Sequence, residues 1–323
     1  MTIACLWVAN WTANTVEQIR ISDMTVLRTA SLGATHSPLG VCLDSATEYL
    51  YVACFSANTV ERIRLSDMTV VGTADLGTSH GPRVVCIDST DTYVYVVNNT
   101  ANTVEQIQIS SMTVVGTADL TAGHDARGIC IDSADAYLYV ACYAANTVEK
   151  IRISDMTVVG TADVTASHNP YGLCIDSSDT YVYVANYTAN TVEQVRLSDM
   201  TVTATADLTA SHGPQMLCID SDDAYLYVGN YTANTVEQIR ISDMTVVATA
   251  DLTASHNPRF VCIDPDDTYM YVSNLTSNTV EQVRISDMTV TGTASVGANH
   301  SPLGVAFGQG DDVGTPVHLI GSF

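Results

Sequence analysis

The sequence has little positive charge and no long apolar run. Its 12 basic residues, of which Lys150 is the single lysine, stand against 35 acidic ones and give a net charge of −23. Such a chain repels the phosphates of nucleic acids and of anionic lipids. No apolar stretch reaches the roughly 18 residues of a membrane-spanning helix, and the first ten residues lack the basic start and the cleavage site of a secretory signal. We therefore expect no nucleic-acid partner, no membrane insertion and no visible export.

Familiar catalytic motifs are also missing. The sequence contains no Gly-x-Ser-x-Gly elbow, no His-Glu-x-x-His, no phosphate loop and no Cys-x-x-Cys. Nearly every acidic or imidazole group recurs in each repeat, whereas a catalyst normally concentrates asymmetry in a few residues. These absences predict a non-enzymatic protein with no catalytic residue, no bound metal and no cofactor.

What the sequence does have is a repeat of 44 residues. Each unit contains four short runs rich in Val, Ile, Thr and Tyr, separated by turn residues, and shows no helical period. Such a unit predicts a four-stranded antiparallel meander, and seven of them predict an all-β, seven-bladed β-propeller. The segment Asn-Thr-Val-Glu marks the copies, beginning at Asn14, Asn58, Asn102, Asn146, Asn190, Asn234 and Asn278.

The chain starts inside a unit, which predicts how the ring closes. Residues 2–10 match the second strand of the other units, and the seventh first strand appears only at residues 302–308. The first blade then combines three N-terminal strands with one C-terminal strand. Since the end units are not polar caps, a closed ring is favoured over a linear solenoid. We expect one domain over residues 1–308 and a C-terminal tail over residues 309–323.

The second strands also carry a family resemblance. They read YVACF, YVVNN, YVACY, YVANY, YVGNY and YVSNL, and each is followed by Asn-Thr-Val-Glu. In this they resemble the Tyr-Val-Thr-Asn repeats of YVTN propellers, over about residues 1–308. The resemblance implies the propeller fold and relatives that include surface-layer proteins, binding modules and lactonases. It points to the cell surface or the exterior, whereas the missing signal points to a cytoplasmic or unsignalled chain, so the location stays open.

Positions that differ between the nearly identical units are those that the scaffold does not dictate. Two such columns, each made of the equivalent residue from every unit, lie beside loops. The first lies beside the loop that enters the first strand, and the second lies beside the loop that follows the second strand. The residue after the first column varies as well. In this strand order both loops lie on one face of the disc, at the mouth of the central channel. The first column includes Arg83, Arg127, Tyr171, Gln215 and Arg259, and the second includes Trp11, Phe55, Tyr143, Tyr187 and Tyr231.

Arginines beside aromatic rings suit an anionic small molecule, a carbohydrate or a peptide, because a guanidinium can form forked hydrogen bonds and stack on rings. The two columns therefore predict a ligand-binding mouth. The alternative is neutral drift, since loops vary wherever they lie.

A constant histidine precedes each first strand. A metal-binding ring is one interpretation, but packed sheets lie about 10 Å apart, whereas zinc needs bonds of about 2.0 to 2.1 Å to each imidazole. We favour a structural ring in which each histidine bonds to the adjoining Thr/Asn loop. Its members are His36, His80, His124, His168, His212, His256 and His300.

Two smaller patterns concern ion pairs and thiols. An Arg-x-x-Asp pair, first seen as Arg20 and Asp23, recurs in six units, and the third unit replaces both residues with Gln108 and Ser111. Their joint loss predicts an ion pair in the turn between the third and fourth strands. The odd number of cysteines, nine, six of which follow the 44-residue period, predicts reduced thiols without a disulfide framework.

Three functional hypotheses remain. The preferred one is a non-enzymatic binding or interaction module whose mouth takes a small-molecule, glycan or protein ligand. The alternative is a structural or assembly protein, such as a surface-layer, filament or virion component. Its discs would associate weakly head to tail, since arginines gather on one face and aspartates on the other. A lactonase-like hydrolase is a distant third and depends on the family resemblance alone.

Overall fold

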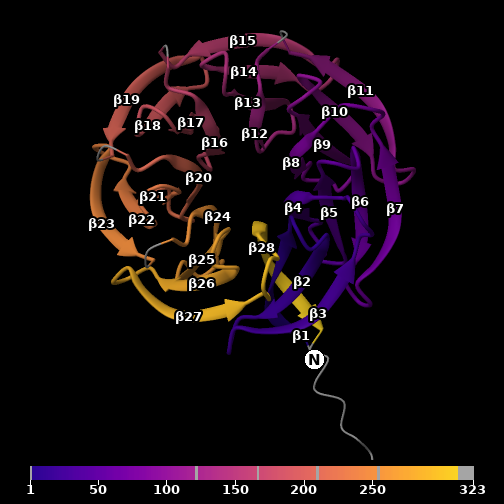
Figure 1. Ribbon diagram of the computed structural model, residues 1–323. Helices are drawn as coiled ribbons and strands as arrows, with labels where there is room; N and C mark the ends of the chain where they lie inside the picture. Colours follow the sequence, from indigo (N-terminus) through magenta and orange to yellow (C-terminus); the bar gives the residue numbers. More distant parts are fainter. Residues whose placement is uncertain (1, 121–122, 166, 209–210, 253–254, 312–323) are drawn as a thin grey trace, which may run out of the picture.

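The computed structural model describes residues 2–120, 123–165, 167–208, 211–252 and 255–311. Over these residues the chain forms seven sheets of four antiparallel strands each, and no helix. The sheets are arranged radially around one axis (Figure 1). The predicted all-β, seven-bladed propeller is confirmed. None of the described residues belongs to a helix that could span a membrane.

Each blade runs outward from an axial strand. The axial strands are β4 (Pro38–Leu43), β8 (Pro82–Ile87), β12 (Ala126–Ile131), β16 (Pro170–Ile175), β20 (Pro214–Ile219), β24 (Pro258–Ile263) and β28 (Pro302–Asp311). The second strands are β1 (Thr2–Asn10), β5 (Tyr49–Cys54), β9 (Tyr93–Asn98), β13 (Tyr137–Cys142), β17 (Tyr181–Asn186), β21 (Tyr225–Asn230) and β25 (Tyr269–Asn274). The third strands are β2 (Thr15–Arg20), β6 (Thr59–Arg64), β10 (Thr103–Gln108), β14 (Thr147–Arg152), β18 (Thr191–Arg196), β22 (Thr235–Arg240) and β26 (Thr279–Arg284). The outer strands are β3 (Thr25–Ser31), β7 (Thr69–Asp75), β11 (Thr113–Asp119), β15 (Thr157–Asp163), β19 (Thr201–Asp207), β23 (Thr245–Asp251) and β27 (Thr289–Ser295).

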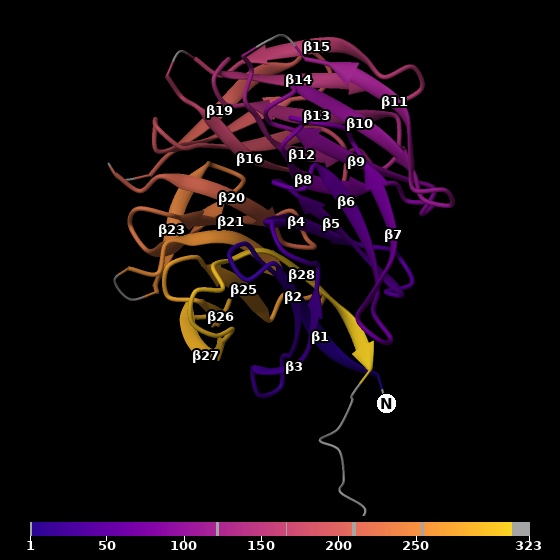
Figure 2. The same ribbon diagram turned by 45° about the vertical axis from the view of Figure 1, so that its right-hand side comes forward.

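The ring closes between the two ends of the chain. Strand β28 pairs antiparallel with β1, so that the first blade has the order β28-β1-β2-β3. Figure 2 shows the yellow C-terminal strand beside the indigo N-terminal strands. The strand continues to Asp311, beyond the predicted Gly308, because Gln309 and Gly310 pair with Ala4 and Ile3. The rest of the predicted tail, 312–323, lies outside the described residues.

The core lies between neighbouring blades. A second strand such as β17 is buried along nearly its whole length because each of its two faces packs against an adjacent sheet. This explains the almost continuous apolar runs of the second strands. In one such layer Tyr139 from β13 packs with Val182 from β17 and Val195 from β18. Burial of an aliphatic side chain of this kind contributes about 1.5–3 kcal/mol, so each blade depends on its two neighbours.

The predicted ion pairs are confirmed in all six units. Arg20 Nη2 lies 2.6 Å from Asp23 Oδ2, and in the third unit Ser111 Oγ donates a hydrogen bond of 3.2 Å to Gln108 Oε1. The arginine lowers the pKa of the Asp23 carboxyl, but exposed pairs contribute only about 0–1 kcal/mol. No disulfide joins the nine cysteines.

Candidate functional site

A cavity of about 530 Å³ opens on the axis of the propeller at one face. Its wall comes from the starts of the axial strands and from the loops that follow the second strands. These loops are held together by the backbone, since Trp11 N donates to Ser301 O at 3.1 Å and Phe55 N donates to Ser37 O at 3.1 Å. The two variable columns therefore lie side by side, in the arrangement that the strand order predicts.

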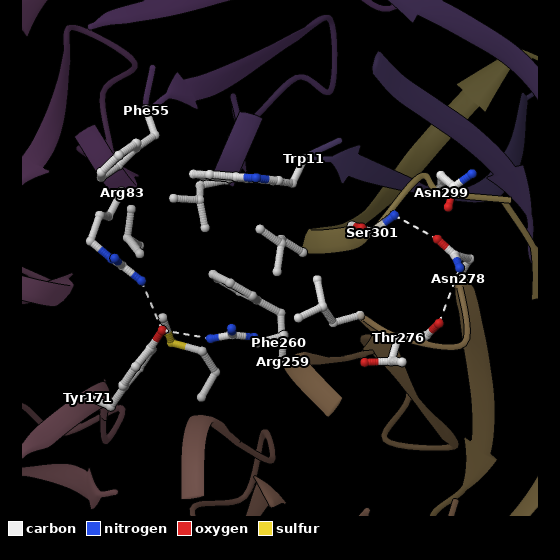
Figure 3. A pocket seen from close by; sticks show the side chains of 15 residues that line it. Trp11, Phe55, Arg83, Tyr171, Arg259, Phe260, Thr276, Asn278, Asn299 and Ser301 are labelled. Atoms are coloured by element: carbon white, nitrogen blue, oxygen red, sulfur yellow. Dashed lines mark hydrogen bonds between the residues drawn. The ribbon is translucent and has the colours of Figure 1, made fainter. Parts of the chain in front are cut away.

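Tyr171 forms the polar centre of the cavity wall. It stands at the start of β16 and is only 4% exposed. Arg83, two blades before it, donates from Nη2 to the phenolic oxygen at 2.9 Å, and Arg259, two blades after it, donates from Nη1 at 3.0 Å. Figure 3 shows the two guanidinium groups converging on this oxygen from opposite sides. The guanidinium carbon of Arg127 lies 4.9 Å from the centre of the Tyr171 ring.

Three nearby cations change the acidity of this phenol. Burial of Tyr171 alone opposes ionisation and raises its pKa, but the positive charges of Arg83, Arg259 and Arg127 outweigh burial. The pKa of Tyr171 is therefore lowered below the ordinary value of 10.0. A phenolate here accepts two charge-assisted hydrogen bonds, which are about twice as strong as neutral ones. The arrangement is a buried phenol whose ionised form is favoured by two fixed cationic donors.

The remaining predicted residues surround this centre. Gln215 Oε1 accepts a hydrogen bond of 2.8 Å from Arg259, and the ring of Tyr231 lies 4.6 Å from the Arg259 guanidinium carbon. The guanidinium carbon of Arg127 lies 3.7 Å from the ring centre of Tyr143.

Aromatic contacts complete this group. The ring centre of Tyr187 lies 6.3 Å from that of Tyr171, and Trp11 and Phe55 stand 5.4 Å apart on the opposite wall. Five of the ten predicted residues therefore line the cavity, namely Trp11, Phe55, Arg83, Tyr171 and Arg259. The other five contact Tyr171 or Arg259 without lining it, namely Arg127, Gln215, Tyr143, Tyr187 and Tyr231. Their role in binding a ligand stays a prediction.

Sequence reasoning missed the apolar side of the cavity. Val84, Met216 and Phe260 line it, and they occupy the position directly after the first variable column. Four other units have glycine there, and in Gly172 a Cβ atom would lie 2.4 Å from Gln215 O. Variation from glycine to a large side chain at this position was the signal that could have identified them. Further lining comes from Leu39, Leu275, Thr276, Asn278, Asn299, Ser301 and Leu303.

The constant histidines have partners beyond those predicted. Each imidazole faces a buried glutamate on the third strand of its own blade, at distances from 2.9 Å for His124 and Glu149 to 3.6 Å for His36 and Glu61. The predicted contact with the adjoining loop is made by the backbone, as in Thr188 N, which donates to His168 O at 3.2 Å. The bond to the loop is thus present through the backbone, whereas the sequence did not indicate the glutamate that faces each imidazole. The physical reason is that a carboxylate buried in each blade needs a donor.

A comparison with protein families finds one match. The family model described as "Lactonase, 7-bladed beta-propeller" matches residues 65–206 and 196–298. No curated protein matches the sequence.

The solved structures show the same fold at low identity. A candidate 6-phosphogluconolactonase from Bacteroides fragilis has a TM-score of 0.78 at 15% identity, with 94% of this chain and 97% of that chain covered. Virginiamycin B lyase from Staphylococcus aureus has a TM-score of 0.76 at 14% identity, with 94% and 95% covered. A functionally unknown protein from Desulfotomaculum acetoxidans has a TM-score of 0.77 at 18% identity, with 95% and 99% covered.

The family match overturns the prediction of a non-enzymatic binding or assembly module. That prediction was drawn from the missing catalytic motifs and from the recurrence of nearly every acidic and imidazole group in each repeat. The matched segments run from residue 65 to residue 298, well over half of the chain. The chain therefore belongs to the lactonase family of seven-bladed β-propellers.

Proposed function

We propose that this protein hydrolyses a lactone, or a similar cyclic ester, in the cavity around Tyr171. The observation that carries the proposal is the phenolic oxygen of Tyr171, which is buried between two guanidinium groups and has a lowered pKa. Membership of the lactonase family supports the same reaction class. A small neutral ring with one polar face suits a cavity that has arginines on one side and apolar side chains on the other.

The residues suggest a direct division of roles. The Tyr171 phenolate takes a proton from a water molecule, whose oxygen attacks the acyl carbon of the lactone. Arg83 and Arg259 donate hydrogen bonds to the oxyanion that develops on the carbonyl oxygen. The bond between the acyl carbon and the ring oxygen then breaks, and the ring oxygen recovers the proton from Tyr171. The product is an open hydroxy acid, whose carboxylate remains beside the same arginines.

The apolar wall has a role as well. Trp11 and Phe55 lie across the cavity from Tyr171 (Figure 3), and Phe260 also lines it. They would cover the hydrocarbon part of the ring and lower the local polarity. In such surroundings the charges of the arginines act more strongly than they do in water.

The experiment is a hydrolysis screen over lactones of different ring size and substitution, followed by comparison of Tyr171→Phe with the wild type. Loss of the base should lower kcat by about 10²- to 10⁴-fold. The matched control is Tyr227→Phe, because this tyrosine is also buried and its oxygen accepts a hydrogen bond of 3.0 Å from Gln238, but it lies in the core between blades. The control should retain activity.

The outcomes separate hydrolysis from its competitors. Reaction in water labelled with ¹⁸O should place the label in the product carboxylate, whereas a lyase of the kind that shares this fold would leave the carboxylate unlabelled. Full activity in Tyr171→Phe, or no ring opening with any lactone, would count against the proposal. The likeness of the second strands to YVTN repeats and the small-molecule partner at the channel mouth are part of the same proposal.

A further inference from the structure

A mixed group of metal-binding side chains lies in the fourth unit. His124 comes from the loop before β12, Cys142 ends β13, and Glu149 lies in β14. Their ligand atoms all lie within 4.8 Å of one another, and the described residues contain no other such group of three. His124 Nδ1 is 2.9 Å from Glu149 Oε1. Three donors of different chemistry therefore converge from three separate segments.

The repeat shows what is unusual at this place. Five units have asparagine where the fourth has Cys142, and in three of them the asparagine amide donates to Oε2 of the glutamate. For example, Asn98 Nδ2 donates to Glu105 Oε2 at 2.9 Å. A thiol is only a weak donor, and in the fourth unit Glu149 Oε2 is buried without a hydrogen-bond partner, as is the same oxygen of Glu17 and Glu193. What sets the fourth unit apart is that the unpaired oxygen lies beside a thiol and an imidazole. A carboxylate that is 4% exposed with one unsatisfied oxygen is costly to bury.

We propose that His124, Cys142 and Glu149 bind a zinc ion. A thiolate, an imidazole nitrogen and a carboxylate oxygen are the donors that zinc takes in proteins, and three of them leave one tetrahedral position for water. The ion would satisfy the free carboxylate oxygen and replace the thiol proton. This departs from the sequence prediction of no metal, which considered only a ring shared between blades. It is independent of the proposed lactone hydrolysis.

The second unit provides an internal control. It holds the same three residue types in His36, Cys54 and Glu61, but its glutamate is already satisfied. Thr59 donates to Glu61 Oε1 at 2.8 Å and Thr73 donates to Oε2 at 2.6 Å, while His36 Nε2 stands 3.6 Å away from Oε1. Composition alone therefore does not define the site, and the second unit is not expected to bind the ion.

The test is a titration of the metal-free, reduced full chain with CoCl₂ and then with ZnCl₂. Cobalt should bind once per chain and give the near-ultraviolet absorption band of a cobalt–thiolate bond, and zinc should displace it. Cys142→Asn should abolish this band and weaken zinc binding by at least about 100-fold. Since asparagine is the natural residue of most other units, this variant is expected to fold, which a thermal melt would check. The matched variant Cys54→Asn should keep the band.

Other results would overturn the proposal. These are a titration with no thiolate band, a band that survives in Cys142→Asn, or a band that is lost in Cys54→Asn instead. The readout is the metal-bound spectrum, so it does not depend on whether any lactone is hydrolysed.

Discussion

Glu17 should destabilise the fold above neutral pH. This carboxyl in β2 is 4% exposed and lies 3.3 Å from Nδ1 of His300. Burial raises its pKa from 4.5 to about 7, although a hydrogen bond from Asn10 partly opposes the shift. The folded chain therefore holds this proton more tightly than the unfolded chain. The resulting stabilisation is fully present below pH 4.5 and is lost as the pH rises through about 7.

The size of the effect follows from the same values. A tenfold difference in proton affinity corresponds to about 1.4 kcal/mol, so the full effect at Glu17 is about 3 kcal/mol. Glu17→Gln replaces the ionisable group with a neutral one of the same shape. We expect the variant to be more stable than the wild type at pH 8.5 by up to about 3 kcal/mol, and this advantage to shrink by about 2 kcal/mol at pH 5.5. Urea unfolding at the two pH values measures both numbers.

Two comparisons isolate the carboxyl. Glu61→Gln should gain no such stability, because both Glu61 oxygens already accept hydrogen bonds from threonine hydroxyls. Repeating the Glu17→Gln measurement with His300→Gln in the background removes the imidazole that faces this carboxyl. An advantage of Glu17→Gln that is the same at pH 5.5 and pH 8.5, or a variant less stable than the wild type at pH 8.5, would refute the reasoning.

Three further predictions concern closure, acidity and association. Truncation after Ser301 removes β28, including the buried Leu303 and Val305. The truncation should remove a large part of the roughly 5–15 kcal/mol by which a folded domain is stable and should cause aggregation through the exposed edge of β1. The control is a chain that ends at Asp311. An unchanged melting temperature of the truncated chain would contradict the prediction. The difference in tyrosinate absorbance between wild type and Tyr171→Phe should show one phenol ionising below pH 10, and identical titrations would contradict it. Because arginines gather on one face of the disc and aspartates on the other, the chain should self-associate weakly at low salt and disperse at high salt, where these charges are screened. Sedimentation would measure the association, and a monomer under both conditions would exclude stacking.

The fold could be predicted from the sequence because one repeat determines all seven blades. Turn residues and β-branched runs recur every 44 residues. A strand that is ambiguous in one unit can therefore be assigned from the equivalent residues of the other six. The end of β28 could not be predicted in this way. Its last residues pair with the first residues of β1, about 300 positions away in the sequence. The axial strands of the other units have no such extension, so the repeat could not predict it.

The position of the candidate site could be predicted from the sequence, but the contacts between its side chains could not. Comparison of the units shows which positions lie at the mouth of the channel, because residues there vary while the scaffold residues stay constant. It does not show which side chains meet across the axis. Arg83 and Arg259 reach Tyr171 from positions 88 residues before and after it, and only the closed ring makes these distances short. The histidine partners were missed for a related reason, because the loop is adjacent in sequence while the glutamate is adjacent only in the folded blade.

The symmetry of the scaffold bears on where the proposed lactone hydrolysis can take place. Seven identical side chains around an axis give a field that is the same in seven directions, and such a field cannot orient one bond of a substrate. Chemistry must therefore come from positions where the blades differ. Tyr171 is the one tyrosine in the first variable column, and its arginine partners on either side define a single direction across the cavity. The proposed reaction therefore uses the asymmetry that this group of residues provides.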